Sequence, residues 1–115
     1  MKPKIYIAGP MKGRLNYNRI AFDQAEKILR GQGFNPINPF IINKDYTYTK
    51  GGYLDNKELR EVALIDCAAI TTCDYIYMLV EWERSVGAQM EHSLAVFLGL
   101  GIIYEGSGLT ENGGS

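Results

Sequence analysis

Hydrophobic and polar positions along the chain alternate between short apolar runs and longer segments with helical spacing. Lys4–Ala8 reads KIYIA, a run rich in β-forming residues that ends at a Gly-Pro pair, which is typical of a buried strand. From Asn18 the apolar residues recur every three or four positions until Gly31, which predicts an amphipathic helix. A second, short strand is expected at residues 34–37, where Pro residues limit its length.

The second half of the chain repeats this order of elements. Residues 40–54 are polar and predict a long loop. Residues 55–72 predict a helix with a cap at Asp55 or Asn56, and residues 74–80 (DYIYMLV) form the clearest strand pattern. A helix is expected at residues 85–98 and a last strand at residues 102–104.

Strands that alternate with helices predict the α/β class. The expected fold is a small Rossmann-like (flavodoxin-like) parallel sheet of about four to five strands with helices on both faces. Ligands of such sheets bind at the carboxyl ends of the strands. Residues 1–105 are expected to form a single domain, and the Gly-rich residues 106–115 a disordered tail.

Composition narrows the classes of function. The 115 residues carry 12 Lys and Arg against 13 Asp and Glu, a balance that does not favour a nucleic acid polymer or an anionic membrane as partner. No apolar segment approaches the roughly 18 residues of a membrane span, and a cytoplasmic protein is expected. Cys67 and Cys73 match neither a zinc nor a redox motif, so no metal and no cofactor are expected.

Glu91 occupies an unusual place on the predicted helix at residues 85–98. Gly87, Glu91 and Ala95 are four residues apart and therefore share one face. The apolar stripe of this helix is expected to be formed by other residues, namely Val86, Met90, Leu94 and Phe97. We expect Glu91 to point into an open space that another molecule can enter, close to the carboxyl end of the strand at 74–80. The alternative is an ordinary solvated surface acid.

Asp66 is the second acid of interest, because it interrupts the apolar stripe of the helix at residues 55–72. It falls between Leu59, Ala63 and Ile70 at helical spacing. A carboxylate in such a position needs hydrogen-bond donors, a raised pKa or the edge of a pocket. Two such acids suit bond cleavage at an anomeric carbon, where one attacks and the other handles protons. The alternative for Asp66 is a bond to the backbone at the edge of the stripe.

The loop after the first strand is a candidate substrate-binding segment. It comprises Gly9, Pro10, Met11, Lys12 and Gly13. Its backbone amides and Lys12 can hold a phosphate, although it matches neither the dinucleotide nor the ATP-binding motif. Ser85 is expected to cap a helix or to contact an anion, and Tyr6 either packs in the core or orients a nucleophile.

Three segments together resemble the nucleoside 2-deoxyribosyltransferase superfamily, including its branch of deoxynucleoside 5'-monophosphate N-glycosidases. They are YIAGPMKG (residues 6–13), DCAAITTCD (residues 66–74) and SVGAQME (residues 85–91). The N-terminal half also resembles small bacterial and phage proteins of unassigned function that are grouped with this superfamily. The resemblance implies that Glu91 attacks C1', that Asp66 positions the substrate and assists protonation of the leaving base, and that Tyr6 orients Glu91. It also implies a homodimer or larger homo-oligomer.

The resemblance also bears on how a 5'-phosphate of the substrate is bound. A Ser at the position of Ser85 is similar to the nucleotide-hydrolysing branch, in which it helps to bind the 5'-phosphate. Pro10 and Lys12 depart from that branch, which has Ser and Arg there, and Lys12 lacks the bidentate geometry of Arg.

The leading hypothesis is an enzyme that cleaves or transfers the N-glycosidic bond of a 2'-deoxynucleoside 5'-monophosphate, or of a deoxynucleoside, through a glycosyl-Glu91 intermediate. Water as the second reactant makes it a hydrolase, and a second base makes it a transferase. One alternative is a nucleotide or nucleotide-derivative binding protein that uses the same pocket without turnover. Another is chemistry on NAD or ADP-ribose.

Overall fold

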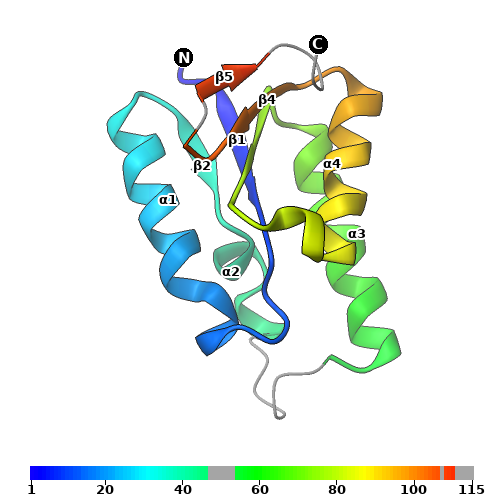
Figure 1. Cartoon of the computed structure of the whole chain (residues 1–115). Helices are drawn as coiled ribbons and strands as arrows, with labels where there is room; N and C mark the ends of the chain where they lie inside the picture. Colours follow the sequence, from blue (N-terminus) through cyan, green and yellow to red (C-terminus); the bar gives the residue numbers. More distant parts are fainter. Residues whose placement is uncertain (47–53, 107, 111–115) are drawn as a thin grey trace.

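A five-stranded sheet forms the centre of the molecule (Figure 1). The computed structural model describes residues 1–46, 54–106 and 108–110. The strands are β1 (Lys4–Ala8), β2 (Asn35–Ile37), β3 (Tyr75–Met78), β4 (Gly101–Tyr104) and β5 (Gly108–Thr110). They lie in the order β2-β1-β3-β4-β5, with β5 antiparallel to β4 and the other pairs parallel.

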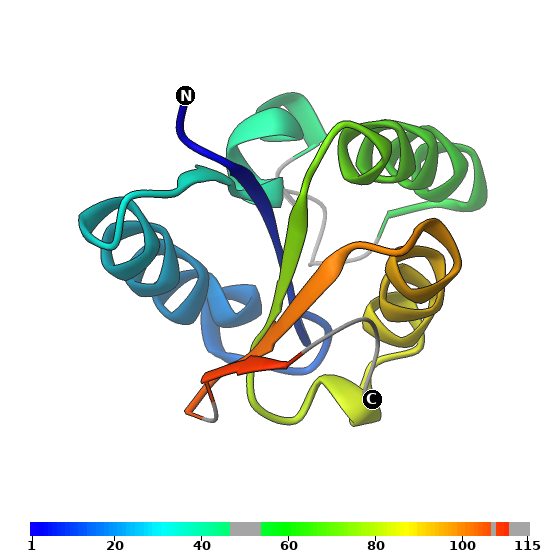
Figure 2. The same cartoon turned by 90° about the horizontal axis from the view of Figure 1, so that it is seen from above.

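Helices cover both faces of this sheet. They are α1 (Arg19–Gly31), α2 (Pro39–Ile42), α3 (Asn56–Thr71) and α4 (Val86–Leu98). Figure 2 shows α1 on one side of the strands and the pair α3 and α4 on the other. The α/β class, the parallel sheet and the helices on both faces are therefore confirmed. None of the described helices is long and apolar enough to cross a membrane.

Side chains of β1 alternate between the two faces. Ile5 and Ile7 pack in the hydrophobic cluster that contains Phe22 of α1, whereas Tyr6 belongs to the cluster beneath α3 and α4. Successive residues of a strand point to opposite faces, so this register directs the Tyr6 ring toward the two helices. All of these side chains are fully buried.

The helix starts follow the capping signals of the sequence. Asp55 accepts a hydrogen bond from the Glu58 backbone N–H at 2.8 Å, and the Glu58 side chain accepts one from the Asp55 N–H. This reciprocal arrangement satisfies two amide groups that the first turn of α3 leaves without helical partners. It fixes the point at which α3 begins and therefore where Asp66 lies along the helix.

The prediction of a long loop from residue 40 is wrong for its first residues, which belong to the helix α2. Asn38 accepts a hydrogen bond from the Phe40 N–H at 3.0 Å, and Pro39 occupies the first turn of α2. Phe40 is buried and packs edge-on against Phe22, with ring centroids 5.2 Å apart. A 3-10 turn at Lys44–Tyr46 follows, and residues 47–53 of the expected loop lie outside the described residues.

Within the tail that the sequence predicts to be disordered, residues 108–110 form β5. The backbone of this strand pairs with β4, with Ile103 opposite Leu109. A strand at the edge of a sheet offers unpaired N–H and C=O groups to any segment that can reach them. Residues 107 and 111–115 of the tail lie outside the described residues.

The prediction that the apolar stripe of α4 faces the core is wrong for Val86, Met90 and Phe97, which are exposed, whereas Leu94 packs against the core as expected. Val86 and Phe97 are 82% and 85% exposed, whereas Ala88, Glu91 and Ala95 form the buried face. Small alanine side chains allow the helix to approach the sheet closely, and Glu91 finds a polar partner beneath it.

Candidate functional site

A buried hydrogen bond joins β1 to α4 at the centre of the candidate site. The Tyr6 hydroxyl donates to Glu91 Oε2 at 2.8 Å. Tyr6 is fully buried and Glu91 is 9% exposed, so the interpretation of Glu91 as a solvated surface acid is wrong. The contact gives the buried carboxyl group the donor that its position requires.

Asp66 lies beside this pair on α3. It is 8% exposed, and its Oδ1 accepts a hydrogen bond from Asn43 Nδ2 at 2.7 Å. Burial raises the pKa of both Asp66 and Glu91, and hydrogen bonding with the Tyr6 hydroxyl opposes that rise in each of them. The structure therefore brings together Tyr6, Asp66 and Glu91, the three residues expected to be catalytic.

The electrostatics of the three groups follow from their burial. Burial, and then repulsion from Asp66, raise the pKa of Glu91 to about 8. Burial raises the pKa of Asp66 to about 6, against the opposing effect of its bonds to Asn43 and Tyr6. The pKa of Tyr6 is raised well above 10, first by burial and then by the charge of Glu91, so its hydroxyl remains protonated. Between about pH 6 and 8 the two acids together therefore hold one proton.

One carboxylate and one carboxylic acid in contact with the same hydroxyl form an arrangement able to carry out nucleophilic and acid–base chemistry. Burial in a low-dielectric region strengthens each of these interactions. Among the described residues, no group of three or more His, Cys, Asp or Glu side chains is placed to hold a metal ion.

The first loop lies at the carboxyl end of β1, as expected. Gly9 and Pro10 are buried, Met11 is half-buried, and Lys12 and Gly13 are exposed. A Cβ on Gly9 would lie 2.7 Å from the Leu79 Cβ, which is closer than side chains normally approach. Gly9 is therefore required by the packing of the loop against the end of β3, whatever ligand the loop binds.

Ser85 and Gly87 begin α4. The Ser85 side chain accepts a hydrogen bond from the Ala88 N–H at 3.2 Å, so it caps the helix. Gly87 is exposed, and a Cβ added to it would come no closer than 3.9 Å to Ser85 Oγ. The structure therefore accounts for Ser85 by capping alone, and its contact with an anion stays a prediction.

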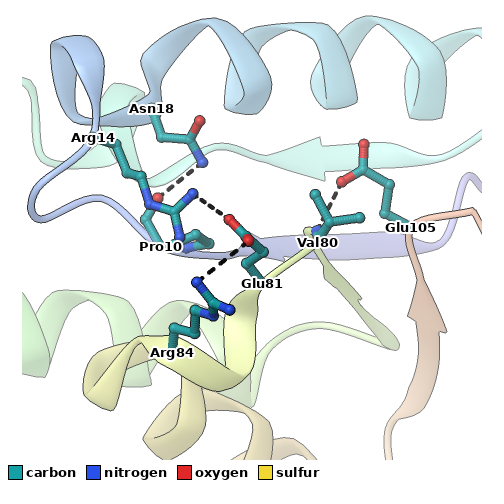
Figure 3. A network of polar contacts seen from close by, with 7 residues as sticks. All are labelled: Pro10, Arg14, Asn18, Val80, Glu81, Arg84 and Glu105. Carbon is teal, nitrogen blue, oxygen red and sulfur yellow. Dashed lines mark hydrogen bonds and ion pairs between the residues drawn. The ribbon is translucent and has the colours of Figure 1, made fainter.

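An ion-pair network that the sequence patterns did not indicate joins the loops that follow β1 and β3. Arg14 Nη1 lies 2.5 Å from Glu81 Oε1, and Arg84 Nη1 lies 3.7 Å from Glu81 Oε2. Figure 3 shows the two guanidinium groups converging on this carboxylate. Arg14, and then Arg84, hold the pKa of Glu81 below its usual range. The loop after β1 thus brings a second cation besides Lys12 to this edge of the sheet.

Asn43 is the other site residue that the patterns did not indicate. It follows α2 and is 3% exposed. The stretch NPFIIN contains a usable signal, because an Asn before a Pro is typical of a helix start. A helix there turns the chain back toward α3, and the contact with Asp66 depends on that turn.

Replacement of Glu91 by Gln should change the pH dependence of stability. The pKa of Glu91 is about 8 in the folded protein against an ordinary value of 4.5. The folded state therefore retains a proton that the unfolded chain releases, and stability falls as pH rises between these values. Glu91→Gln lacks this loss, so its thermal midpoint should match that of the wild type at pH 4 and exceed it by about 4 °C or more at pH 9.

Thermal unfolding followed by circular dichroism at both pH values tests this expectation. Glu83→Gln, at an exposed position close to the start of α4, should show no such pH-dependent difference. An equal gap between Glu91→Gln and the wild type at both pH values would contradict the raised pKa.

Solved structures with the same fold include enzymes of nucleoside chemistry. A 2-deoxyribosyltransferase from Bacillus psychrosaccharolyticus matches 88% of this chain and 70% of its own, with a TM-score of 0.65 and 19% identity. A 2-deoxyribosyltransferase from Leishmania mexicana matches 89% of this chain, with a TM-score of 0.60 and 21% identity. A CMP N-glycosidase from Clostridium botulinum, BcmB, has a TM-score of 0.49 and 13% identity over 88% of this chain. The chain spans 63% and 66% of the last two proteins.

At these identities the two transferases establish the fold, which agrees with the fold implied by the resemblance. No curated protein sequence matches the chain. A family model described as "Domain of unknown function (DUF4406)" matches residues 3–104, a range that includes Tyr6, Asp66 and Glu91. The chain therefore belongs to the DUF4406 family.

Proposed function

We propose that this protein cleaves or transfers the N-glycosidic bond of a 2'-deoxynucleoside 5'-monophosphate or of a deoxynucleoside, through a covalent bond between Glu91 and C1'. The observation that carries the proposal is the buried hydrogen bond from Tyr6 to Glu91 beside Asp66. The fold shared with 2-deoxyribosyltransferases supports it. Proteins rarely bury two acids together without a partner cation unless the pair has a function.

The first step uses the two acids in different roles. An ionised Glu91 oxygen forms a bond to C1' while the bond between C1' and the base nitrogen breaks. The electron pair of that bond passes to the base, and Asp66 gives its proton to the base, which leaves as a neutral molecule. Tyr6 holds Glu91 by donating its hydroxyl hydrogen to Oε2.

The second step regenerates Glu91. Water or a second base attacks C1', the bond from C1' to Glu91 breaks, and the proton of the attacking group returns to Asp66. The same residues thus serve a hydrolase or a transferase, and only the second reactant differs.

The loops at the carboxyl ends of β1 and β3 favour a nucleotide over a nucleoside. Lys12, Arg14 and Arg84 lie on these loops, where the single carboxylate of Glu81 is shared by the two guanidinium groups, and α4 begins at Ser85 in the same region. Helix starts and guanidinium groups are good phosphate ligands. Gly87 has no side chain at the second position of α4, which gives a ligand room to approach there.

A binding protein without turnover is the second candidate. The pKa of about 8 keeps Glu91 mostly protonated at neutral pH in the unliganded site. A protonated carboxyl is not a nucleophile, which favours a pocket that recognises a nucleotide through hydrogen bonds alone.

The outward apolar side chains of α4 support a homo-oligomer. Val86, Met90 and Phe97 lie 82%, 40% and 85% exposed along the helix that also carries Glu91. Exposed apolar residues gathered on one helix are typical of protein interfaces. A second copy of this chain packed on α4 would cover them and would lie near the candidate site.

Incubation with deoxynucleoside 5'-monophosphates tests the proposed reaction directly. Wild-type protein should release free base, detected by chromatography, and Glu91→Gln should release none because an amide cannot attack C1'. Tyr6→Phe should turn over about tenfold to a hundredfold more slowly, since it loses the hydrogen bond to a charged group. Glu83→Gln should retain wild-type rates. Base release by Glu91→Gln at the wild-type rate would rule out the covalent mechanism.

The rate should depend on pH through both acids. Below about pH 6 both are protonated and no nucleophile is present, whereas above about pH 8 both are ionised and no acid is present. A plot of kcat/KM against pH should therefore be bell-shaped between these limits. Asp66→Asn should lose the alkaline limb and much of the rate. A wild-type rate that rises steadily to pH 10 would exclude Asp66 as the acid.

Substitution on the outer face of α4 tests the homo-oligomer. Phe97→Glu should shift the wild-type particle to the mass of a monomer in light scattering, because a buried unpaired charge weakens an apolar interface. Lys27→Glu, on the exposed side of α1, is the control and should leave the mass unchanged. A monomeric wild type would contradict the proposal.

A further inference from the structure

Asn43 has a buried acceptor without a partner. Its Nδ2 donates to Asp66 Oδ1 at 2.7 Å, and the residue is 3% exposed. Within the part of the chain that the structure describes, Asn43 Oδ1 is the single buried side-chain oxygen or nitrogen that makes no hydrogen bond. Folded proteins rarely leave such an atom unsatisfied, because its lost hydration is not replaced.

Asn38 provides a direct comparison at the other end of α2. It is 2% exposed, and its amide is fully used. Its Nδ2 donates to Asp23 and Glu26 at 3.0 Å each, and its Oδ1 accepts from the Phe40 N–H. The fold can therefore satisfy a buried asparagine in this segment, so the free oxygen of Asn43 needs a separate explanation.

The position of Asn43 points to the reaction site. Because Nδ2 and Oδ1 share one carbon, the free oxygen lies at the edge of the carboxyl group that Nδ2 holds. The end of α2 does not need this amide, since the backbone N–H of Asn43 already bonds to the Pro39 carbonyl at 3.0 Å. The acceptor is therefore placed beside Asp66, the group that the proposed reaction uses to protonate the leaving base.

A protonated Asp66 and the Asn43 oxygen form a neighbouring donor and acceptor. Adenine presents the complementary pair, with the acceptor N7 beside the N6 amino donor, and cytosine presents N3 beside its N4 amino group. Bases with an oxo group at the same position present an acceptor to the Asn43 oxygen instead, which is repulsive. This rule separates adenine from hypoxanthine and guanine, and cytosine from uracil and thymine.

We propose that Asn43 and Asp66 together select amino-substituted nucleobases, an inference that rests on the proposed function. Asp66 gives its proton to the ring nitrogen of the base, and Asn43 Oδ1 accepts a hydrogen bond from the neighbouring amino group. The electron pair of the C1'–N bond passes into the base, which leaves as a neutral tautomer. The Asn43 N–H then stabilises the carboxylate that Asp66 has become.

Two matched substrate pairs test the selection. The 5'-monophosphates of deoxyadenosine and deoxyinosine differ at position 6 and at N1, which carries a hydrogen in hypoxanthine, and both keep N7 as an acceptor. Those of deoxycytidine and deoxyuridine differ at position 4 and at N3, which carries a hydrogen in uracil. Wild-type kcat/KM should be about tenfold to a hundredfold higher for the amino member of each pair that is turned over. Equal rates, or faster turnover of the oxo member, would overturn the proposal and leave the proposed function intact.

Substitutions at two asparagines test whether Asn43 is responsible for the preference for amino-substituted bases. Asn43→Leu keeps a side chain of similar size without polar atoms. Its ratio of deoxyadenosine to deoxyinosine rates should fall to about one, because N7 can accept the Asp66 proton in both bases. Its ratio of deoxycytidine to deoxyuridine rates should fall less, because the N3 hydrogen of uracil still faces Asp66. Asn38→Leu removes a fully bonded buried amide and should retain the wild-type ratio even where stability falls. An unchanged ratio in Asn43→Leu would overturn the assignment, and if that variant does not fold, the wild-type comparison still decides the selection.

A binding measurement separates the failure of this inference from the failure of the proposed function. Absence of turnover with all four nucleotides would contradict the proposed reaction. Calorimetric titration of the wild type and of Asn43→Leu with the same four nucleotides then decides the role of Asn43. Tighter binding of the amino members that is lost in Asn43→Leu supports it. Equal binding within each pair, or binding of none, overturns it.

Discussion

The hydrogen bond from Tyr6 to Glu91 determines how the rest of this face of the molecule is built. Burying a carboxyl group is unfavourable unless a donor is present, and β1, an inner strand of the sheet, supplies that donor. Once Glu91 faces the sheet, the helical positions above and below it also face the sheet. These positions hold Ala88 and Ala95, which are small enough for α4 to pack closely. One polar contact thus sets the rotation of α4.

That rotation has a further consequence on the outside of the helix. The largest apolar side chains of α4, among them Phe97, are left toward solvent because the inner face holds the acid and two alanines. A monomer loses the hydrophobic free energy that these side chains would otherwise contribute to its core. The buried polar site and the exposed apolar surface therefore both result from the same rotation of α4 about its axis.

The sequence predicts the parts of this structure that depend on local spacing. The order of strands and helices, the cap at Asp55 and the inward position of Asp66 follow from patterns within single segments. The rotation of α4 does not, because hydrophobicity favours the face with Met90 and Phe97, and only the position of Tyr6 on another element reverses that preference. A pattern within one helix contains no information about its polar partner.

Contacts between distant segments account for the other differences. Asn43 meets Asp66 only because a short helix replaces the expected loop, and Arg14 meets Glu81 only because β1 and β3 are neighbours in the sheet. Each of these residues can be read from the sequence, but which of them pair in space cannot. The strand order follows the crossovers of the whole chain, which local spacing does not specify.

The location of the shared proton is the remaining constraint on any chemistry at this site. In the unliganded pair the proton favours Glu91, whose pKa of about 8 is the higher, whereas the proposed reaction needs it on Asp66, whose pKa is about 6. The Asn43 N–H opposes that transfer, because it favours the ionised form of Asp66. In the proposed reaction, a substrate would reverse this balance when positive charge develops at C1' beside Glu91 and a basic ring nitrogen approaches Asp66. The Tyr6 hydroxyl, which donates to Glu91 and also influences the pKa of Asp66, is the group through which a proton would pass between the two acids in that reaction. In the proposed reaction the reactive ionisation state therefore forms only around a bound substrate, and the unliganded site keeps Glu91 protonated.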